Sequence, residues 1–128
     1  MRLPLALILA ATTATAQDRL NAEQFDALVT GLTITYLADD GVTVGVEAYH
    51  PNGRVTWVVS DGVCQKGRWY QEGEQICFIY QGYDTPECTW FSHREGTFIS
   101  AHTSGSVTWT STSVSTDPIP CAMDYVGS

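Results

Sequence analysis

The chain has 128 residues, of which 6 are Lys or Arg and 14 are Asp or Glu, so its formal net charge at pH 7 is −8. Such a charge opposes binding to nucleic acid and to anionic membrane surfaces, and we expect neither as a partner. The length fits a single domain with a modest hydrophobic core.

The first 16 residues have the layout of a secretory signal peptide. Arg2 precedes an apolar run from Leu3 to Ala11, and Ala14-Thr15-Ala16 provides an A-x-A cleavage site. The apolar run is too short to cross a bilayer, and no later segment approaches the ~20 apolar residues of a transmembrane helix. We therefore expect cleavage after Ala16, which leaves residues 17–128 as one disulfide-bonded domain, periplasmic or secreted, without membrane insertion.

Residues 21–29 carry the pattern of one short amphipathic helix. Asn21 is a good N-cap residue, the first turn is acidic, and Phe25, Leu28 and Val29 recur at helical spacing. The helix should end before the next glycine. We expect it to close one mouth of the β-structure that follows.

Glycines next to polar turn-forming residues punctuate the rest of the chain at intervals near ten residues. Between them lie runs rich in Val, Thr, Ile, Tyr, Phe and Trp, which favour short strands. No helix-length segment separates these strands, so parallel pairing is not expected. The turn glycines are Gly41, Gly53, Gly62, Gly73, Gly96 and Gly105.

Alternation within these runs indicates strands with one buried face. Val55, Trp57 and Val59 share one face of a strand, and the run from Ile76 to Tyr80 alternates in the same way. The fold class is therefore mainly β. We predict a small antiparallel meander of about eight strands, closed or half-closed into a barrel and preceded by the short helix.

Four cysteines in an exported chain of this size favour two disulfides over a metal site, and three pairings are open in principle. If residues 74–81 and 86–93 form a hairpin, the numbers of opposite residues sum to 165. Cys77 and Cys88 meet this condition and would face each other across the ladder. That pairing leaves Cys64 to bond with Cys121.

The segment 103–116 is rich in Ser and Thr, and Val107, Trp109 and Val114 are its only large apolar residues. We expect its first half to form the last strand and its second half to be a loop. The prolines at 118 and 120 exclude a central strand there. A glycosylated stalk is an alternative interpretation of the same composition.

Three motifs lie between Asn21 and Ala101: Leu28…Gly31…Thr33, then Tyr49…Asn52-Gly53-Arg54, then Gly67…Trp69…Gly73…Ile76-Cys77-Phe78…Tyr80…Cys88. These motifs resemble those of a group of small exported bacterial proteins of unknown function. More loosely, Pro120-Cys121 and Val126-Gly127 are similar to the terminal cysteine segment of that group. The resemblance implies a lipocalin-like or avidin-like β-fold in the periplasm and assigns no catalytic residue.

Two enzyme hypotheses rest on histidines and carboxylates. His50, His93 and His102 each flank a turn and form a metal site only if the fold brings them together. Ser104 next to Gly105 is a candidate nucleophile with His102, but it lacks the G-x-S-x-G context. Each of these residues has a sufficient structural explanation, so we expect no metal, no cofactor and no catalytic residue.

Aromatic side chains carry the most information about a binding site. Most of them should fill the interior of a small barrel. Some of Trp57, Trp69, Tyr80 and Trp90 are expected to line a residual pocket at the open end. Such a pocket would serve as a ligand-binding or docking site.

These observations favour a noncatalytic binding or accessory module that docks on an envelope protein. The reasons are a disulfide-bonded β-scaffold, an acidic surface and many aromatic residues. The first alternative is a binder of a small apolar ligand in the barrel mouth. The second is a hydrolase or metal enzyme that uses the histidines and carboxylates.

The first prediction concerns processing and redox state. The exported protein should begin at Gln17 and carry two disulfides, because an A-x-A site precedes Gln17 and the cysteine count is even. Intact-mass measurement after treatment with an alkylating agent, without reduction, should show no added mass. Alkylation of any cysteine under these conditions would contradict the prediction.

Overall fold

The computed structural model describes residues 2–4, 18–60, 62–121 and 123–124. The expected signal peptide and its cleavage site therefore lie outside the described residues, apart from positions 2–4. No helix in the described ranges is long and apolar enough to cross a membrane.

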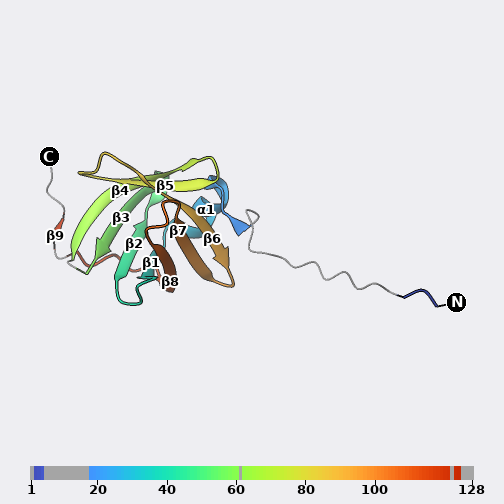
Figure 1. Cartoon of the computed structure of the whole chain (residues 1–128). Helices are drawn as coiled ribbons and strands as arrows, with labels where there is room; N and C mark the ends of the chain where they lie inside the picture. The colour runs from blue at the N-terminus through green and yellow to red at the C-terminus, as the bar shows by residue number, and fades with distance from the viewer. Residues whose placement is uncertain (1, 5–17, 61, 122, 125–128) are drawn as a thin grey trace.

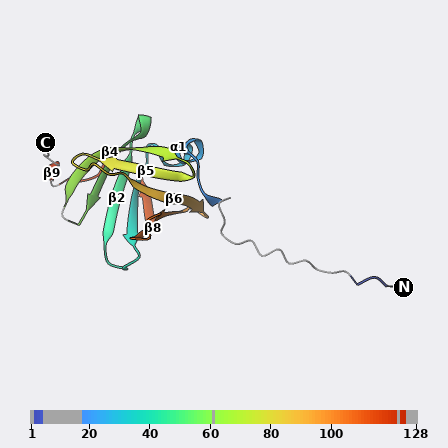
Figure 2. The same ribbon diagram turned by 45° about the horizontal axis from the view of Figure 1, so that its top comes forward.

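Eight antiparallel strands form a closed barrel, as predicted (Figures 1 and 2). Each strand pairs with the next along the chain, and the eighth pairs with the first. The strands are β1 (Thr33–Ala38), β2 (Val44–Tyr49), β3 (Arg54–Val59), β4 (Val63–Glu72), β5 (Gln75–Tyr80), β6 (Glu87–Arg94), β7 (Thr97–His102) and β8 (Thr108–Ser115). A 3₁₀ turn (η2, Pro51–Gly53) joins β2 to β3, and the short β9 (Met123–Asp124) pairs in parallel with β4.

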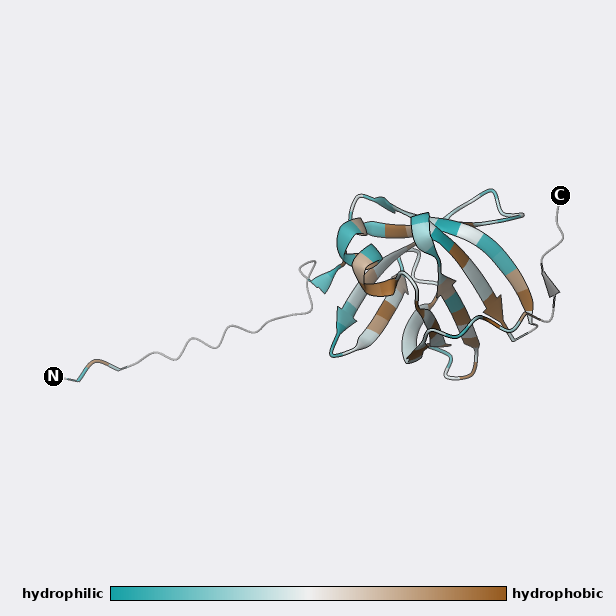
Figure 3. Ribbon diagram, turned by 180° about the vertical axis from the view of Figure 1, so that it is seen from behind, coloured by the Kyte–Doolittle hydropathy of each residue, from teal (hydrophilic) through white to brown (hydrophobic). Residues whose placement is uncertain are grey.

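Side chains of alternate residues point into the barrel. In β1, Ile34, Tyr36 and Ala38 are buried, whereas the residues between them are partly exposed. Apolar and hydrophilic segments alternate along the strands in Figure 3. This alternation follows from the two-residue repeat of a strand, which sends successive side chains to opposite faces. The core is therefore the interior of the barrel.

The barrel has two different ends because every strand reverses the chain direction. The connections β1–β2, β3–β4, β5–β6 and β7–β8 lie at one end, which we call the open end. The connections β2–β3, β4–β5 and β6–β7 lie at the other, which we call the sealed end. The helix α1 (Ala22–Val29) belongs to the sealed end.

Helix α1 begins at a reciprocal cap. The side chain of Asn21 accepts a hydrogen bond from the backbone N–H of Gln24 at 2.9 Å, and the Gln24 side chain accepts one from the N–H of Asn21 at 3.0 Å. This capping box satisfies two N–H groups that a helix start leaves without partners. The predicted helix is confirmed within one residue at its start.

Phe25 is the residue through which the helix seals the barrel. Its side chain is fully buried, and its ring centroid lies 4.6 Å from that of Phe91, 4.9 Å from that of Trp69 and 5.6 Å from that of Tyr49. These partners come from β6, β4 and β2, so one side chain joins strands from around the barrel. The expectation that the helix closes one mouth agrees with this packing.

Both predicted disulfides are present. Cys77 and Cys88 are opposite residues of β5 and β6, in the register deduced from the sequence, with a Cα–Cα distance of 4.0 Å. Cys64 and Cys121 are bonded with a Cα–Cα distance of 5.5 Å, which ties the tail to β4. Two disulfides and no free cysteine are typical of an oxidising, extracytoplasmic environment.

The expectation for the Ser/Thr-rich segment was wrong in its placement of the strand. Residues 103–107 form the turn around Gly105, and the second half of the segment is β8. Hydroxyl-bearing and β-branched side chains suit a half-exposed strand. The partly polar β8 forms because it pairs with both β1 and β7 and closes the ring.

The second prediction concerns the packing of Phe25 at the sealed end. Replacing Phe25 by Ala should lower the free energy of unfolding by about 3–5 kcal/mol, because it leaves a cavity among rigid aromatic rings. Urea unfolding followed by tryptophan fluorescence measures this change. Val42→Ala is the control, since Val42 is 80% exposed, and its effect should stay within about 0.5 kcal/mol. A Phe25→Ala loss no larger than that of the control would contradict the role of the helix.

Candidate functional site

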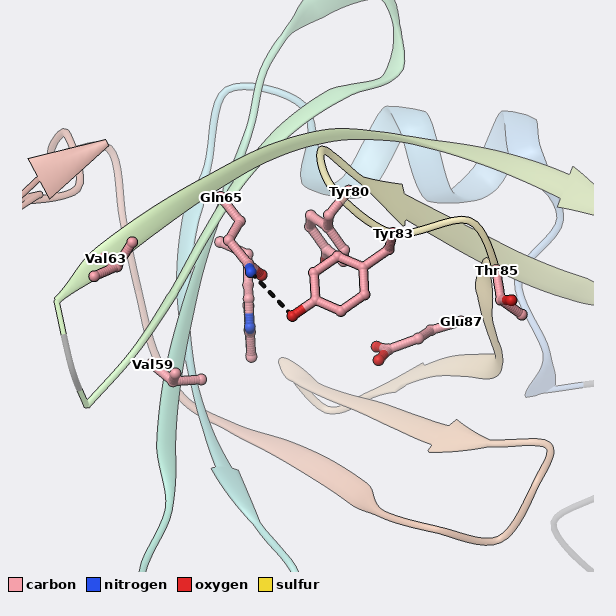
Figure 4. Close-up of a pocket in the computed structure, with 8 residues that line it drawn as sticks. Val59, Val63, Gln65, Tyr80, Tyr83, Thr85 and Glu87 are labelled. Carbon is pink, nitrogen blue, oxygen red and sulfur yellow. Dashed lines mark hydrogen bonds between the residues drawn. The ribbon is translucent and has the colours of Figure 1, made fainter. Parts of the chain in front are cut away.

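A cavity of about 250 Å³ lies at the open end, between β3, β4, β5 and β6. We call it the open mouth. Figure 4 shows the labelled side chains of Gln65, Tyr80, Tyr83 and Glu87 around one hollow. The lining residues are Trp57, Val59, Val63, Gln65, Tyr80, Tyr83, Thr85 and Glu87.

Tyr83 forms the outer wall of the open mouth. It belongs to the β5–β6 connection, where Gly82 has a φ of 87° and the N–H of Tyr83 donates to the carbonyl of Tyr80 at 3.1 Å. Its hydroxyl accepts a hydrogen bond from Gln65 Nε2 at 3.2 Å (Figure 4). Tyr83 is nevertheless 56% exposed. An aromatic ring held mainly by one hydrogen bond can adjust to a ligand at modest cost.

A second cavity of about 40 Å³ lies deeper in the barrel, and we call it the inner cavity. It shares Trp57, Tyr80 and Glu87 with the open mouth, so the two cavities adjoin. The volume exceeds what one water molecule needs. Its lining residues are Tyr36, Glu47, Tyr49, Trp57, Phe78, Tyr80, Glu87, Thr89, Phe91, Ser100, His102 and Trp109.

Trp57 is opposite Glu47 of β2, and its side chain can lie inside the barrel because its ring packs over Gly45 of the same strand. A Cβ atom added at Gly45 would lie 2.1 Å from Cη2 of Trp57, far inside van der Waals contact. The Trp57 ring also packs edge-on against Trp109, with centroids 5.2 Å apart. The absence of a side chain at Gly45 therefore creates the space that this aromatic wall occupies.

Glu47 is the one acidic residue, among those the structure describes, that is buried in the barrel. It lies on β2 between Gly45 and Tyr49 in the inward-facing set and is only 3% exposed. Its Oε1 accepts a hydrogen bond from the Tyr80 hydroxyl at 2.7 Å. Its Oε2 is buried and has no hydrogen-bond partner among the described residues.

Burial raises the pKa of Glu47 well above its ordinary value. Desolvation outweighs the Tyr80 hydrogen bond, which lowers this pKa, and the negative charge of Glu87 adds to the increase. Burial also raises the pKa of Tyr80, which keeps its hydroxyl protonated as a donor. The inner cavity therefore favours a protonated, neutral carboxyl at Glu47 when no other charge is near.

Two tyrosines form a second polar pair in the interior. The hydroxyl groups of Tyr36 and Tyr49 are 2.8 Å apart, and both side chains are buried. Burial raises the pKa of both phenols, so neither ionises near neutral pH. The pair satisfies itself and offers the inner cavity a polar but uncharged wall.

The rim carries His102, Glu87 and two serines. His102 Nε2 lies 3.9 Å from a Glu87 oxygen, which is beyond hydrogen-bond distance, and its Nδ1 lies 3.3 Å from the hydroxyl of Ser106. Ser104, the candidate nucleophile from the sequence, donates its hydrogen bond to Ser106 at 2.9 Å. The histidine therefore contacts Ser106 of its own turn, with Ser104 one hydrogen bond further away.

The structure brings two of the four predicted aromatic site residues to the open mouth. Trp57 and Tyr80 line it, whereas Trp69 packs against Phe25 at the sealed end. Trp90 lies on the outer face of β6, because its neighbours in the strand point inward, and the guanidinium of Arg19 sits 4.4 Å from its ring centroid.

The three histidines are not gathered into one site. His50 lies at the sealed end, where its Nε2 is 2.9 Å from Thr56 Oγ1, and His93 packs on the ring of Phe98. Only His102 lies at the open end. Among the described residues, one group of His, Cys, Asp and Glu has a spacing that suits a metal, namely Glu72, Cys77 and Cys88. Both of its cysteines are bonded to each other, so they offer no thiolate.

Sequence reasoning missed Glu47, Glu87 and Trp109 as site residues. The alternation of β2 contained a signal, since Glu47 occupies the same parity as Tyr49 and Gly45. An acidic residue on the buried face of a strand is unusual enough to single out. Nothing comparable marks Glu87, whose position at the mouth depends on how β6 meets β3 and β5.

Comparison with protein-family models, with curated proteins and with solved structures returned no match. The likeness to small exported bacterial proteins therefore stays a prediction. The function is inferred below from the geometry of the open mouth and the inner cavity.

The third prediction is a pH dependence of stability. Because burial raises the pKa of Glu47, the folded protein binds this proton more tightly than the unfolded chain does. The free energy of unfolding should fall as pH rises above the ordinary Glu value of 4.5, until the pH passes the raised pKa. The contribution of one proton to this slope is at most about 1.4 kcal/mol per pH unit.

Urea unfolding from about pH 4 to pH 8 measures the slope in the wild type and in Glu47→Gln. The variant should lack this contribution, since the amide does not titrate. Glu72→Gln is the matched control, because it is the same substitution at an exposed carboxyl group of the sealed end. Identical slopes in the wild type and Glu47→Gln would show that Glu47 does not titrate with a raised pKa.

Proposed function

We propose that this protein is a noncatalytic binding protein, periplasmic or secreted, that holds a small ligand in its open mouth. The observation that carries the proposal is a barrel sealed by Phe25 at one end and hollow at the other, where the open mouth adjoins the inner cavity. A cavity that opens at one end of a closed β-barrel is a common form of small-molecule site.

The side chains that line the open mouth and the inner cavity suit recognition of a small, partly apolar ligand. Trp57, Trp109 and Tyr80 provide aromatic surface, and a few polar groups lie among them. Apolar walls with few well-placed polar groups are typical of ligand pockets. The edge-on packing of Trp57 on Trp109 holds this surface in place before a ligand arrives. Such preorganisation lowers the entropic cost of binding.

The volume of the open mouth limits the ligand. At about 250 Å³ it is slightly smaller than the roughly 300–1,000 Å³ of pockets for drug-sized ligands. A ligand with one ring and a short side chain matches this size. The inner cavity of about 40 Å³ has room for one small polar group. We therefore propose that the ring occupies the mouth and that a polar end points inward.

Docking on an envelope protein, the first expectation from the sequence, is the second candidate function. Two exposed apolar side chains on connections of the open end favour it: Val42 between β1 and β2, and Tyr83 between β5 and β6. Aromatic residues are enriched in interfaces. The hollow interior supports the small-ligand proposal more directly, since a docking surface requires no cavity behind it.

The fourth prediction tests ligand binding with 2-phenylethanol, a neutral one-ring probe. Tryptophan fluorescence and saturation-transfer NMR should both report saturable binding. Trp57→Ala should weaken it by about 1–3 kcal/mol, or roughly fivefold to 160-fold, because the wall of both cavities is lost. Trp90→Ala is the control, since Trp90 lies on the outer face, and it should leave the affinity unchanged.

Two outcomes would contradict the proposal. The first is no saturable signal in the folded wild-type protein from 2-phenylethanol or from its charged analogue phenethylamine. The second is equal weakening by Trp57→Ala and Trp90→Ala, because that result would place the probe outside the barrel.

A further inference from the structure

The proposed function leaves open which ligand chemistry the open mouth and the inner cavity select. Glu47 offers the strongest indication. A carboxyl group at this depth is costly, and Oε2 without a hydrogen-bond partner among the described residues adds to the cost. Position 47 faces the barrel interior, where an apolar side chain would avoid this desolvation cost. Glu47 lines the inner cavity, so its carboxyl group borders the space that a ligand group would enter.

Aromatic rings surround this carboxyl. Tyr80 donates to its Oε1, and Tyr36, Tyr49, Trp57 and Trp109 line the same inner cavity. The faces of such rings attract cations, and the attraction grows where water is excluded. A carboxyl group within an aromatic enclosure combines an anionic partner with several weakly negative ring faces. That combination suits a positively charged group better than a neutral or an anionic one.

The charges around the open mouth also favour a positively charged ligand. Glu87 is 60% exposed in its side chain and lines both cavities, so a ligand passes it on the way in. Among the described residues no Lys or Arg lines either cavity, and His102 is the only one of them there that can become positive. The whole chain carries a formal net charge of −8. An acidic entrance in an acidic protein concentrates cations.

We propose that the ligand is a small primary amine with one aromatic ring or a short apolar body, and that its ammonium group enters the inner cavity to bind Glu47 Oε2. This inference rests on the proposed function, since it needs the open mouth to bind a small molecule. The ammonium donates to the carboxylate oxygen, the rings of Trp57 and Trp109 flank the apolar body, and Glu87 attracts the cation at the entrance.

Binding of an amine releases a proton. In the unliganded protein burial favours the protonated carboxyl of Glu47, whereas an adjacent ammonium lowers the pKa of this group and favours the carboxylate. The carboxyl O–H bond breaks, its proton passes to solvent, and the carboxylate pairs with the ammonium. Affinity should therefore rise with pH until the pH passes either the raised pKa of Glu47 or the pKa of the amine, which is about 10 for a group like the Lys side chain.

The other titratable groups that face Glu47 do not replace it as the source of the released proton. Tyr80 from β5, Tyr36 from β1 and Tyr49 from β2 all have raised pKa values and stay neutral. Glu87 from β6 and His102 from β7 lie toward the rim and face each other at 3.9 Å. The controls must therefore separate Glu47 from Glu87 and His102.

The experiment compares phenethylamine with 2-phenylethanol, which has the same ring and chain but no charge. Isothermal titration calorimetry at about pH 6 and pH 8 measures both affinities, in buffers of different ionisation enthalpy so that proton release is counted. We expect the amine to bind at least about tenfold tighter than the alcohol at the higher pH, with net proton release. Glu47→Gln should abolish this preference and leave binding of the alcohol in place.

Matched variants locate the charge that matters. Glu72→Gln removes one negative charge at the sealed end and should leave the preference for the amine unchanged. Glu87→Gln and His102→Gln, at the rim, should change it less than Glu47→Gln does. Proton release is measured on the wild-type protein, so the inference stays testable even if Glu47→Gln does not fold.

The outcomes separate this inference from the proposed function. Equal affinities for amine and alcohol, or amine binding without proton release, would overturn the amine assignment and leave small-ligand binding standing. A preference that survives in folded Glu47→Gln but disappears in Glu87→Gln would overturn the role of Glu47. Failure of both probes to bind would overturn the proposed function and this inference together.

Discussion

Closure of the strand ring is the constraint on which the rest of this structure depends. β8 pairs with β7 on one side and with β1 on the other, so no strand of the ring keeps a free edge. Only a closed ring has an interior with two separate ends. The packing of Phe25 into one end and the burial of Glu47 both require that interior. β8 can be polar because it closes the ring through backbone pairing with β1 and β7, more than through its side chains.

The two ends of the barrel differ in chemistry because different side chains meet there. At the sealed end, aromatic rings from four elements pack on one another around Phe25. At the open end, Gly45 makes room for Trp57, and acidic and hydroxyl groups take positions that apolar side chains could fill. Buried Glu47 costs stability, whereas the aromatic core and two disulfides stabilise the fold. The costly carboxyl group in the inner cavity is one of the observations on which the proposed binding role rests.

Several elements were predictable because short-range rules determine them. The cap at Asn21 and the pairing of Cys77 with Cys88 each depend on residues within about twelve positions of one another. The location of the last strand was not predictable in this way. Residues 103–107 and 108–115 have similar Ser and Thr content, and only the pairing of β8 with β1, some seventy residues earlier, decides which half is the strand.

The sequence by itself determined the mainly β class, the short helix, the eight-strand meander and both disulfides, since periodicity, turn residues and hairpin register are local properties. It also indicated Trp57 and Tyr80 as candidates for the mouth. The tertiary structure alone decided that Glu47, Trp57, Tyr80, Glu87 and Trp109 surround one pair of cavities, while Trp69 and Trp90 lie elsewhere. These residues come from five strands, and their meeting depends on the register, twist and closure of the whole ring, which no local pattern encodes.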